Sequence, residues 1–133
     1  MLNIDTISWL KMAATGYLLT ISFETPVLFA CLGKRYTARQ KLIAGVLLTA
    51  LSYPFVVFVF PLIWNPYENY PVYISVSEVF APVFECLSFA MLFQRKKTLS
   101  KNQRFLDYAA IVLANLFSFL SGEIMKWAGV HFA

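Results

Sequence analysis

Positive charge is concentrated in two short segments of this chain, and each segment lies between two long apolar runs. Nine of the 11 basic residues fall in these segments, namely Lys34, Arg35, Arg39 and Lys41 in the first and Arg95, Lys96, Lys97, Lys101 and Arg104 in the second. Lys and Arg resist translocation across a membrane, so loops that contain them stay in the cytoplasm. The pattern predicts a multi-pass protein of the cell membrane, with loops 34–41 and 94–104 cytoplasmic and both termini outside.

The apolar runs are long enough to cross a bilayer. We expect spans at about 11–33, 42–64, 72–93 and 105–127. Each has about 22 residues, which suffices for a hydrocarbon layer of roughly 30 Å. The connections are too short for crossovers, so neighbouring spans must be antiparallel. The predicted fold is an all-α membrane protein, a single domain over 1–133 whose four transmembrane helices form an up-down bundle.

Composition agrees with this fold and limits the function classes. Hydrophobic residues make up 59% of the chain and charged residues 14%, whereas a soluble domain has about 25% charged residues. The net charge of +4 comes from loops that face a membrane surface, so we expect anionic lipid headgroups as partners and no nucleic acid. Glycine-rich phosphate loops, nucleophile elbows and Cys/His metal spacings are absent from the sequence. We therefore expect no enzyme, no cofactor and no metal site.

The two halves of the chain show a weak internal similarity. The first span of each half contains a Phe-Glu pair, ending in Glu24 and Glu85, that precedes a basic pair by ten residues. The second spans align when Lys41 is paired with Arg104. The bundle would then consist of two pseudo-repeated hairpins, related by an axis along the membrane normal.

Carboxyl groups inside the spans are the main candidates for chemistry. A charged side chain at mid-bilayer costs roughly 3 kcal/mol or more, so each of these groups needs a partner, water or a proton. Counted from the cytoplasmic ends of their spans, Glu24, Glu85 and Asn115 lie within about 3 Å in depth, close to the midplane. Glu78 lies two turns from Glu85 on the same helix face. The sequence predicts a polar ladder that leads from the outer surface to the centre of the bundle.

Smaller features accompany this ladder. Glu123 near the outer end of the fourth span can form an interfacial ion pair with Lys126. Prolines 26, 54 and 82 each free one helix carbonyl, and proline 26 frees that of Ser22. Residues 114, 118 and 122 form a stripe of small side chains that lets another helix approach closely. The expected proton-, cation- or substrate-binding residues are Glu24, Glu85, Glu78, Asn115, Ser118 and Ser22.

Four stretches, at 22–26, 52–61, 77–85 and 115–122, are together similar to small bacterial four-span integral membrane proteins of unassigned function. This resemblance implies a bacterial plasma membrane and no particular activity. The small multidrug exporters also have four spans, with one essential glutamate in the first span, where Glu24 stands here. This chain departs from them in its additional buried acids, its strongly basic loops and its predicted outside termini.

Three functions are compatible with these residues. The first is a small proton- or cation-coupled transporter or channel-like protein, in which Glu24 and Glu85 exchange the ion, Glu78 relays it and Asn115 orients the site. Four helices leave little room for a pore, so this function suggests a homodimer. The second is a structural or accessory subunit whose buried acids specify helix packing or a partner. The third is binding of a lipid or pigment between the helices.

Overall fold

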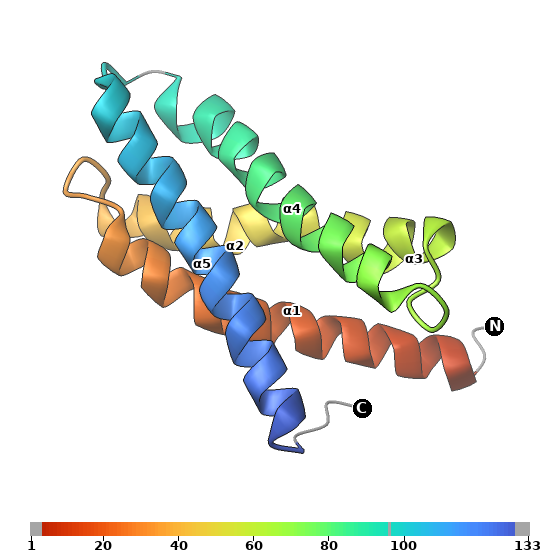
Figure 1. Cartoon of the computed structure of the whole chain (residues 1–133). Helices are drawn as coiled ribbons and strands as arrows, with labels where there is room; N and C mark the ends of the chain where they lie inside the picture. Colours follow the sequence, from red (N-terminus) through yellow and green to blue (C-terminus); the bar gives the residue numbers. More distant parts are fainter. Residues whose placement is uncertain (1–3, 96, 130–133) are drawn as a thin grey trace.

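The structure is a computed structural model that describes residues 4–95 and 97–129, and these residues are helical except for short turns. The elements in chain order are α1 (Ile4–Cys31), α2 (Ala38–Pro54), the π-helix η1 (Phe55–Val59), α3 (Phe60–Ile63), α4 (Tyr70–Phe89), the π-helix η2 (Ala90–Gln94) and α5 (Lys101–Trp127). Segments η1 and α3 continue α2, and η2 continues α4, so the chain forms four long rods (Figure 1).

All four rods are long and apolar enough to cross a membrane, which confirms the predicted four-span fold. All four begin earlier than predicted, at Ile4, Ala38, Tyr70 and Lys101 instead of 11, 42, 72 and 105. The first helix begins at Ile4, and Asp5 in its first turn interacts favourably with the helix dipole. The fourth begins at Lys101, because Ser100 forms an N-cap there.

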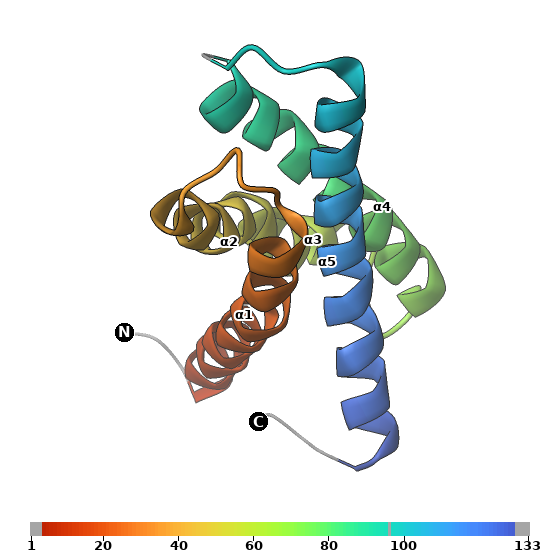
Figure 2. The ribbon, with the colours of Figure 1, turned by 90° about the vertical axis from the view of Figure 1, so that its left-hand side faces the viewer.

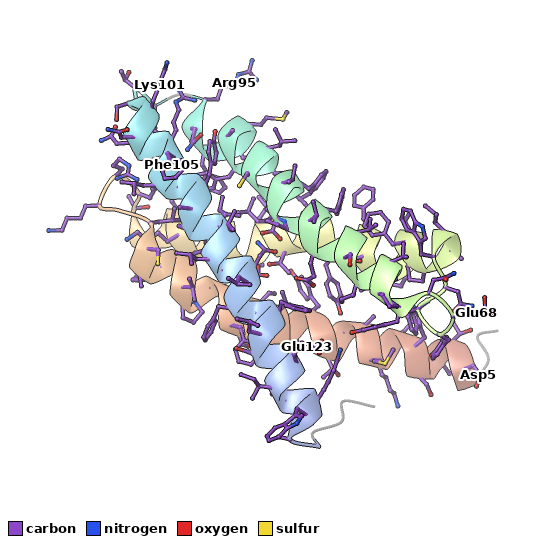
Figure 3. The ribbon with its side chains drawn as sticks, in the orientation of Figure 1. Asp5, Glu68, Arg95, Lys101, Phe105 and Glu123 are labelled. Carbon is purple, nitrogen blue, oxygen red and sulfur yellow. The ribbon has the colours of Figure 1, made fainter. Side chains whose placement is uncertain are left out.

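The rods form an up-down bundle with a square cross-section. Helix α1 packs on α2 and α5, and α4 packs on the same two helices. The α1–α2 and α4–α5 loops lie at one end, and the turn between α3 and α4 lies at the other (Figure 1). Figure 3 shows Arg95 and Lys101 at the first end and Asp5 and Glu68 at the second. We call the first the loop end and the second the terminal end.

The two helical hairpins use the same device to start their second helices. Thr37 caps α2 and exchanges hydrogen bonds with Gln40, and Ser100 caps α5 and exchanges hydrogen bonds with Gln103. Such a capping box satisfies two backbone N–H groups that a helix terminus leaves free. The alignment that pairs Lys41 with Arg104 also pairs these two boxes. The capping boxes therefore give structural support to the suggested repeat.

Helix α1 lies close to α2 along much of its length. Gly45 faces the side chain of Thr25, and Gly16 faces the phenol of Tyr53, which donates a hydrogen bond of 2.9 Å to the Ala13 carbonyl. Helices α4 and α5 cross each other (Figure 2). Hydrogen bonds join the α4 rod to α5 from the loop end to the level of Glu85 and Asn115, and beyond that level the two helices splay apart toward the terminal end (Figure 1).

Pro54 ends α2, and the π-helix η1 follows it directly. A proline lacks the N–H that would complete the α-helical ladder. In η1 the phenol of Tyr73 on α4 donates a hydrogen bond of 2.8 Å to the carbonyl of Val56. A side chain of the neighbouring helix therefore satisfies irregular backbone at membrane depth, where no water is available to do so.

The fully apolar core lies between the loop end and the level of the central glutamates. Its buried side chains come from all four rods, and they are Leu28, Leu32, Tyr36, Ala44, Leu48, Phe89, Ala110, Ile111 and Ala114. We call this group, apart from Tyr36, the apolar layer. It lies between the loop end and the level of Glu24 and Glu85.

The close contact between Gly45 and Thr25 makes a testable prediction. A methyl group at Gly45 would overlap three side-chain atoms of Thr25, and such overpacking typically costs about 1–3 kcal/mol. We expect Gly45→Ala to lower the free energy of unfolding in bicelles by this amount. Gly122→Ala is the control, since no atom lies within 4 Å of its added methyl group. Equal stability of the two variants would contradict the α1–α2 packing described here.

Candidate functional site

A cavity of about 200 Å³ lies inside the bundle, between the apolar layer and the terminal end. All four rods contribute to its wall. Its charged and polar lining residues are Thr20, Glu24, Thr49, Ser52, Tyr53, Ser77, Glu78, Glu85, Asn115, Ser118, Glu123 and Lys126. Four carboxyl groups and a single ammonium group therefore share this space, which favours the binding of protons or other cations.

Glu85 on α4 is held from two sides and is only 2% exposed. Ser52 on α2 donates a hydrogen bond of 2.7 Å to Oε1, and Asn115 Nδ2 on α5 donates one of 2.8 Å to Oε2. Asn115 also donates a bond of 3.0 Å to the carbonyl of Ile111, which fixes the orientation of its amide. The Glu85 carboxyl group thus joins three helices.

Glu24 on α1 is 3% exposed and bonds to α2 through a single hydroxyl group. Thr49 Oγ1 lies 3.0 Å from Glu24 Oε2 and 3.1 Å from the carbonyl oxygen of Gly45. A threonine hydroxyl has only one hydrogen to donate, but it can also accept. Both contacts become full hydrogen bonds when Glu24 carries a proton and donates it toward Thr49. The geometry therefore accommodates the protonated acid.

The terminal end of the cavity is more open. Glu78 lies there half-buried on α4. On α5, Lys126 Nζ lies 3.2 Å from Glu123 Oε1, and it donates a hydrogen bond of 3.3 Å to the phenol of Tyr70. The predicted Glu123–Lys126 ion pair is confirmed. An exposed pair of this kind contributes at most about 1 kcal/mol to stability. Glu123 can therefore separate from Lys126 at little cost in free energy.

Five of the six predicted site residues line this one cavity, and Ser22 does not. The Ser22 side chain is exposed and donates a hydrogen bond of 2.7 Å to the carbonyl of Leu18 on its own helix. Two positions along a helix correspond to a rotation of about 200°, so Ser22 and Glu24 point to different faces. The predicted role of Gly122 also changes, because it borders the cavity rather than a closely packed helix.

Sequence reasoning missed a further buried carboxyl group, that of Asp107, which lies near the start of α5 and is fully buried. Arg35 in the α1–α2 loop forms a hydrogen-bonded ion pair with Asp107 Oδ1. The Tyr36 phenol and Gln94 Nε2 donate to Oδ2 at 2.5 and 3.0 Å. The partners of Asp107 therefore come from the α1–α2 loop and from η2. We call these four residues the loop-end network.

Two further contacts reinforce the loop-end network. Tyr108 donates a hydrogen bond of 2.9 Å to Gln94 Oε1, and Lys97 donates one of 2.9 Å to the carbonyl of Arg35. Burial raises the pKa of the Tyr36 phenol, and its hydrogen bond to Asp107 raises it further. Tyr36 consequently stays neutral and remains a hydrogen-bond donor at any physiological pH.

Metal binding finds no geometric support among the described residues, where no three His, Cys, Asp or Glu side chains are placed to hold an ion. The comparisons with known proteins add no further assignment: no protein-family model, no curated protein and no solved structure matches this chain.

The amide of Asn115 provides a direct test of the Glu85 site. Asn115→Leu keeps a side chain of similar size but leaves Glu85 Oε2 without its donor. An unsatisfied buried acceptor costs about 1–3 kcal/mol, so we expect this loss in the free energy of unfolding. Ser118→Ala, in the same cavity wall, should change stability by less than about 0.5 kcal/mol. If both variants unfold alike, the Asn115–Glu85 bond is not a stabilising contact.

Proposed function

We propose that this protein is a small proton- or cation-coupled transporter or channel-like protein, and that Glu24 and Glu85 are its exchange sites. One observation supports this most directly: both carboxyl groups border a cavity instead of being sealed among packed side chains. Ionisable residues within the membrane are expensive, and they typically mark proton or ion pathways.

The hydrogen-bond partners of the glutamates suit a group that gains and loses a proton. The hydroxyl groups of Thr49 and Ser52 can donate to a carboxylate and can accept from a carboxylic acid. Each glutamate therefore retains a partner in both protonation states. Asn115 holds the other oxygen of Glu85 in place.

Glu78 continues the pathway toward the terminal end. It lies two turns before Glu85 on α4 and borders the same cavity. Beyond it, Glu123 and Lys126 line the mouth of the cavity. In this proposal Glu78 relays the ion between the mouth and the central pair.

The positive-inside rule orients the proposed pathway. It assigns the loop end to the cytoplasm and the terminal end to the outside, so the cavity would face outward. The basic residues of both loops would contact anionic headgroups of the inner leaflet. Four helices leave little room for a pore that crosses the membrane. A second copy of the chain in a homodimer would supply further helices to line the pathway.

A structural function is the second candidate, and the pattern of hydrogen bonds favours it specifically. Glu24–Thr49 joins α1 to α2, while Glu85 joins α4 to α2 through Ser52 and to α5 through Asn115. Polar side chains often hold membrane helices together in this way. Such a function requires the hydrogen bonds but does not require the cavity.

Flux through liposomes distinguishes the two functions. We expect the double variant Glu24→Gln, Glu85→Gln to lose at least about 90% of proton or monovalent-cation flux, because glutamine keeps hydrogen bonds but cannot exchange a proton. Flux is followed with an internal pH dye under an imposed gradient. Glu68→Gln is the matched control, since Glu68 lies exposed in the turn before α4. A double variant with full flux would exclude the exchange function.

Single cysteines test the proposed orientation. In a variant with Cys31→Ser and Cys86→Ala, we expect Glu68→Cys to react with a membrane-impermeant maleimide added to whole cells. Lys34→Cys should react only after the cells are opened, because basic loops stay in the cytoplasm. Both positions are exposed in the structure, so burial does not limit either reaction. The reverse labelling pattern would require the cavity to face the cytoplasm.

A further inference from the structure

We propose that the loop-end network, centred on the Arg35–Asp107 ion pair, is the inner gate of the cavity. This inference rests on the proposed function, because a gate implies that the cavity opens in turn to each side. In this structure the gate is closed, while the opposite end of the cavity is open.

The cavity, the apolar layer and the gate follow one another along the bundle. On α5, Asn115 lines the cavity, Ile111 and Ala110 follow in the apolar layer, and Asp107 comes next at the loop end. The same order holds along α1 and the loop that follows it, where Glu24 is followed by Leu28 and Leu32 of the apolar layer and then by Tyr36 of the network. An ion that leaves the central glutamates toward the loops must pass the apolar layer and then the network.

The network also holds α5, the α1–α2 loop and the end of the α4 rod together. Asp107 on α5 binds Arg35 and Tyr36 beyond the end of α1, and Gln94 at the end of α4. At the terminal end, α4 and α5 are joined by the exposed contact of Lys126 with Tyr70. This difference matches the arrangement of the helices, in which the α4 rod is bonded to α5 from the loop end to the level of Glu85 and splays away from it toward the terminal end (Figure 1).

Two features make this contact suitable for reversible opening. A buried ion pair gains little net stability, because desolvation of the charges offsets their attraction. The Arg35 side chain keeps 22% of its surface exposed, and its buried Nε has no hydrogen-bond partner. Rotation of Arg35 into water would satisfy this donor but would leave the buried Asp107 carboxylate without its counter-ion, so the closed state is the favoured one and the open state is the minor one.

The segment that carries Gln94 provides a place for the movement. Gln94 is the last residue of η2, the π-helix that ends the α4 rod. Short π-helical segments inside α-helices frequently occur at functional sites. A change of η2 to α-helical geometry would rotate Gln94 relative to α4 and withdraw its amide from Asp107.

A buried cysteine beside the gate reports its state without any assay of transport. Ala110 lies one turn after Asp107 and is 1% exposed. We would introduce Ala110→Cys together with Cys31→Ser and Cys86→Ala, and add a membrane-impermeant maleimide to the loop side of oriented vesicles. The thiol should react slowly while the gate is closed.

Variants of the ion pair should open the gate. We expect Asp107→Asn and Arg35→Gln to accelerate labelling of the cysteine by about tenfold or more, since each removes one charge of the pair and shifts the population toward the open state. Glu68→Gln is the matched control, because it removes an exposed carboxylate from the turn before α4, outside both the cavity and the loop-end network. It should leave the labelling rate at the wild-type value.

Labelling of Asp107→Asn and Arg35→Gln at the control rate would overturn the gate. If Asp107→Asn fails to elute as a folded protein, Tyr36→Phe replaces it. This variant removes only one hydrogen bond to Asp107, so it should accelerate labelling by a smaller factor. Faster labelling combined with full flux in the Glu24→Gln, Glu85→Gln variant would support the gate and contradict the exchange function instead.

Discussion

Every polar group at membrane depth must find its partner inside the protein, and this constraint determines how the four helices meet. Glu24 and Glu85 cannot be left alone in hydrocarbon. Their partners Thr49, Ser52 and Asn115 come from neighbouring helices, so satisfying the carboxyl groups also specifies which helices are neighbours. The same requirement explains the Tyr73 bond to the π-helical backbone that follows Pro54.

The carboxyl groups toward the terminal end and the one near the loops have different surroundings. Toward the terminal end the carboxyl groups of Glu24, Glu78 and Glu85 share a cavity. Toward the loops, Asp107 is completely enclosed by donors. The apolar layer separates the two. One polar cluster on a cavity and a second enclosed by donors are compatible with the proposed ion pathway, which would be open to a single side at a time.

Much of this arrangement could be predicted from the sequence. Charge distribution and hydropathy predicted four spans, which the structure has. Counting residues along the spans brought Glu24, Glu85 and Asn115 together as a candidate site, and all three line one cavity. Asp107 was missed because it stands next to basic residues near the expected start of a span, where a carboxylate is ordinarily solvated. Its burial depends on a tertiary contact with Arg35, which is distant in sequence. Ser22 could have been excluded from the sequence alone, because a helical residue two positions from Glu24 points to a different face, whereas the two π-helices depend on packing.

The most direct test of the exchange function is the state of the central carboxyl groups in a lipid-embedded sample. Infrared difference spectroscopy follows the stretching band of protonated carboxyl groups, and the Glu24→Gln, Glu85→Gln variant assigns it. Exchange sites at a membrane pathway should respond near physiological pH. We predict that the assigned band changes reversibly between about pH 5 and 8. A band that keeps a constant intensity over this range would show that the two glutamates are permanently neutral packing groups, and it would contradict the proposed function.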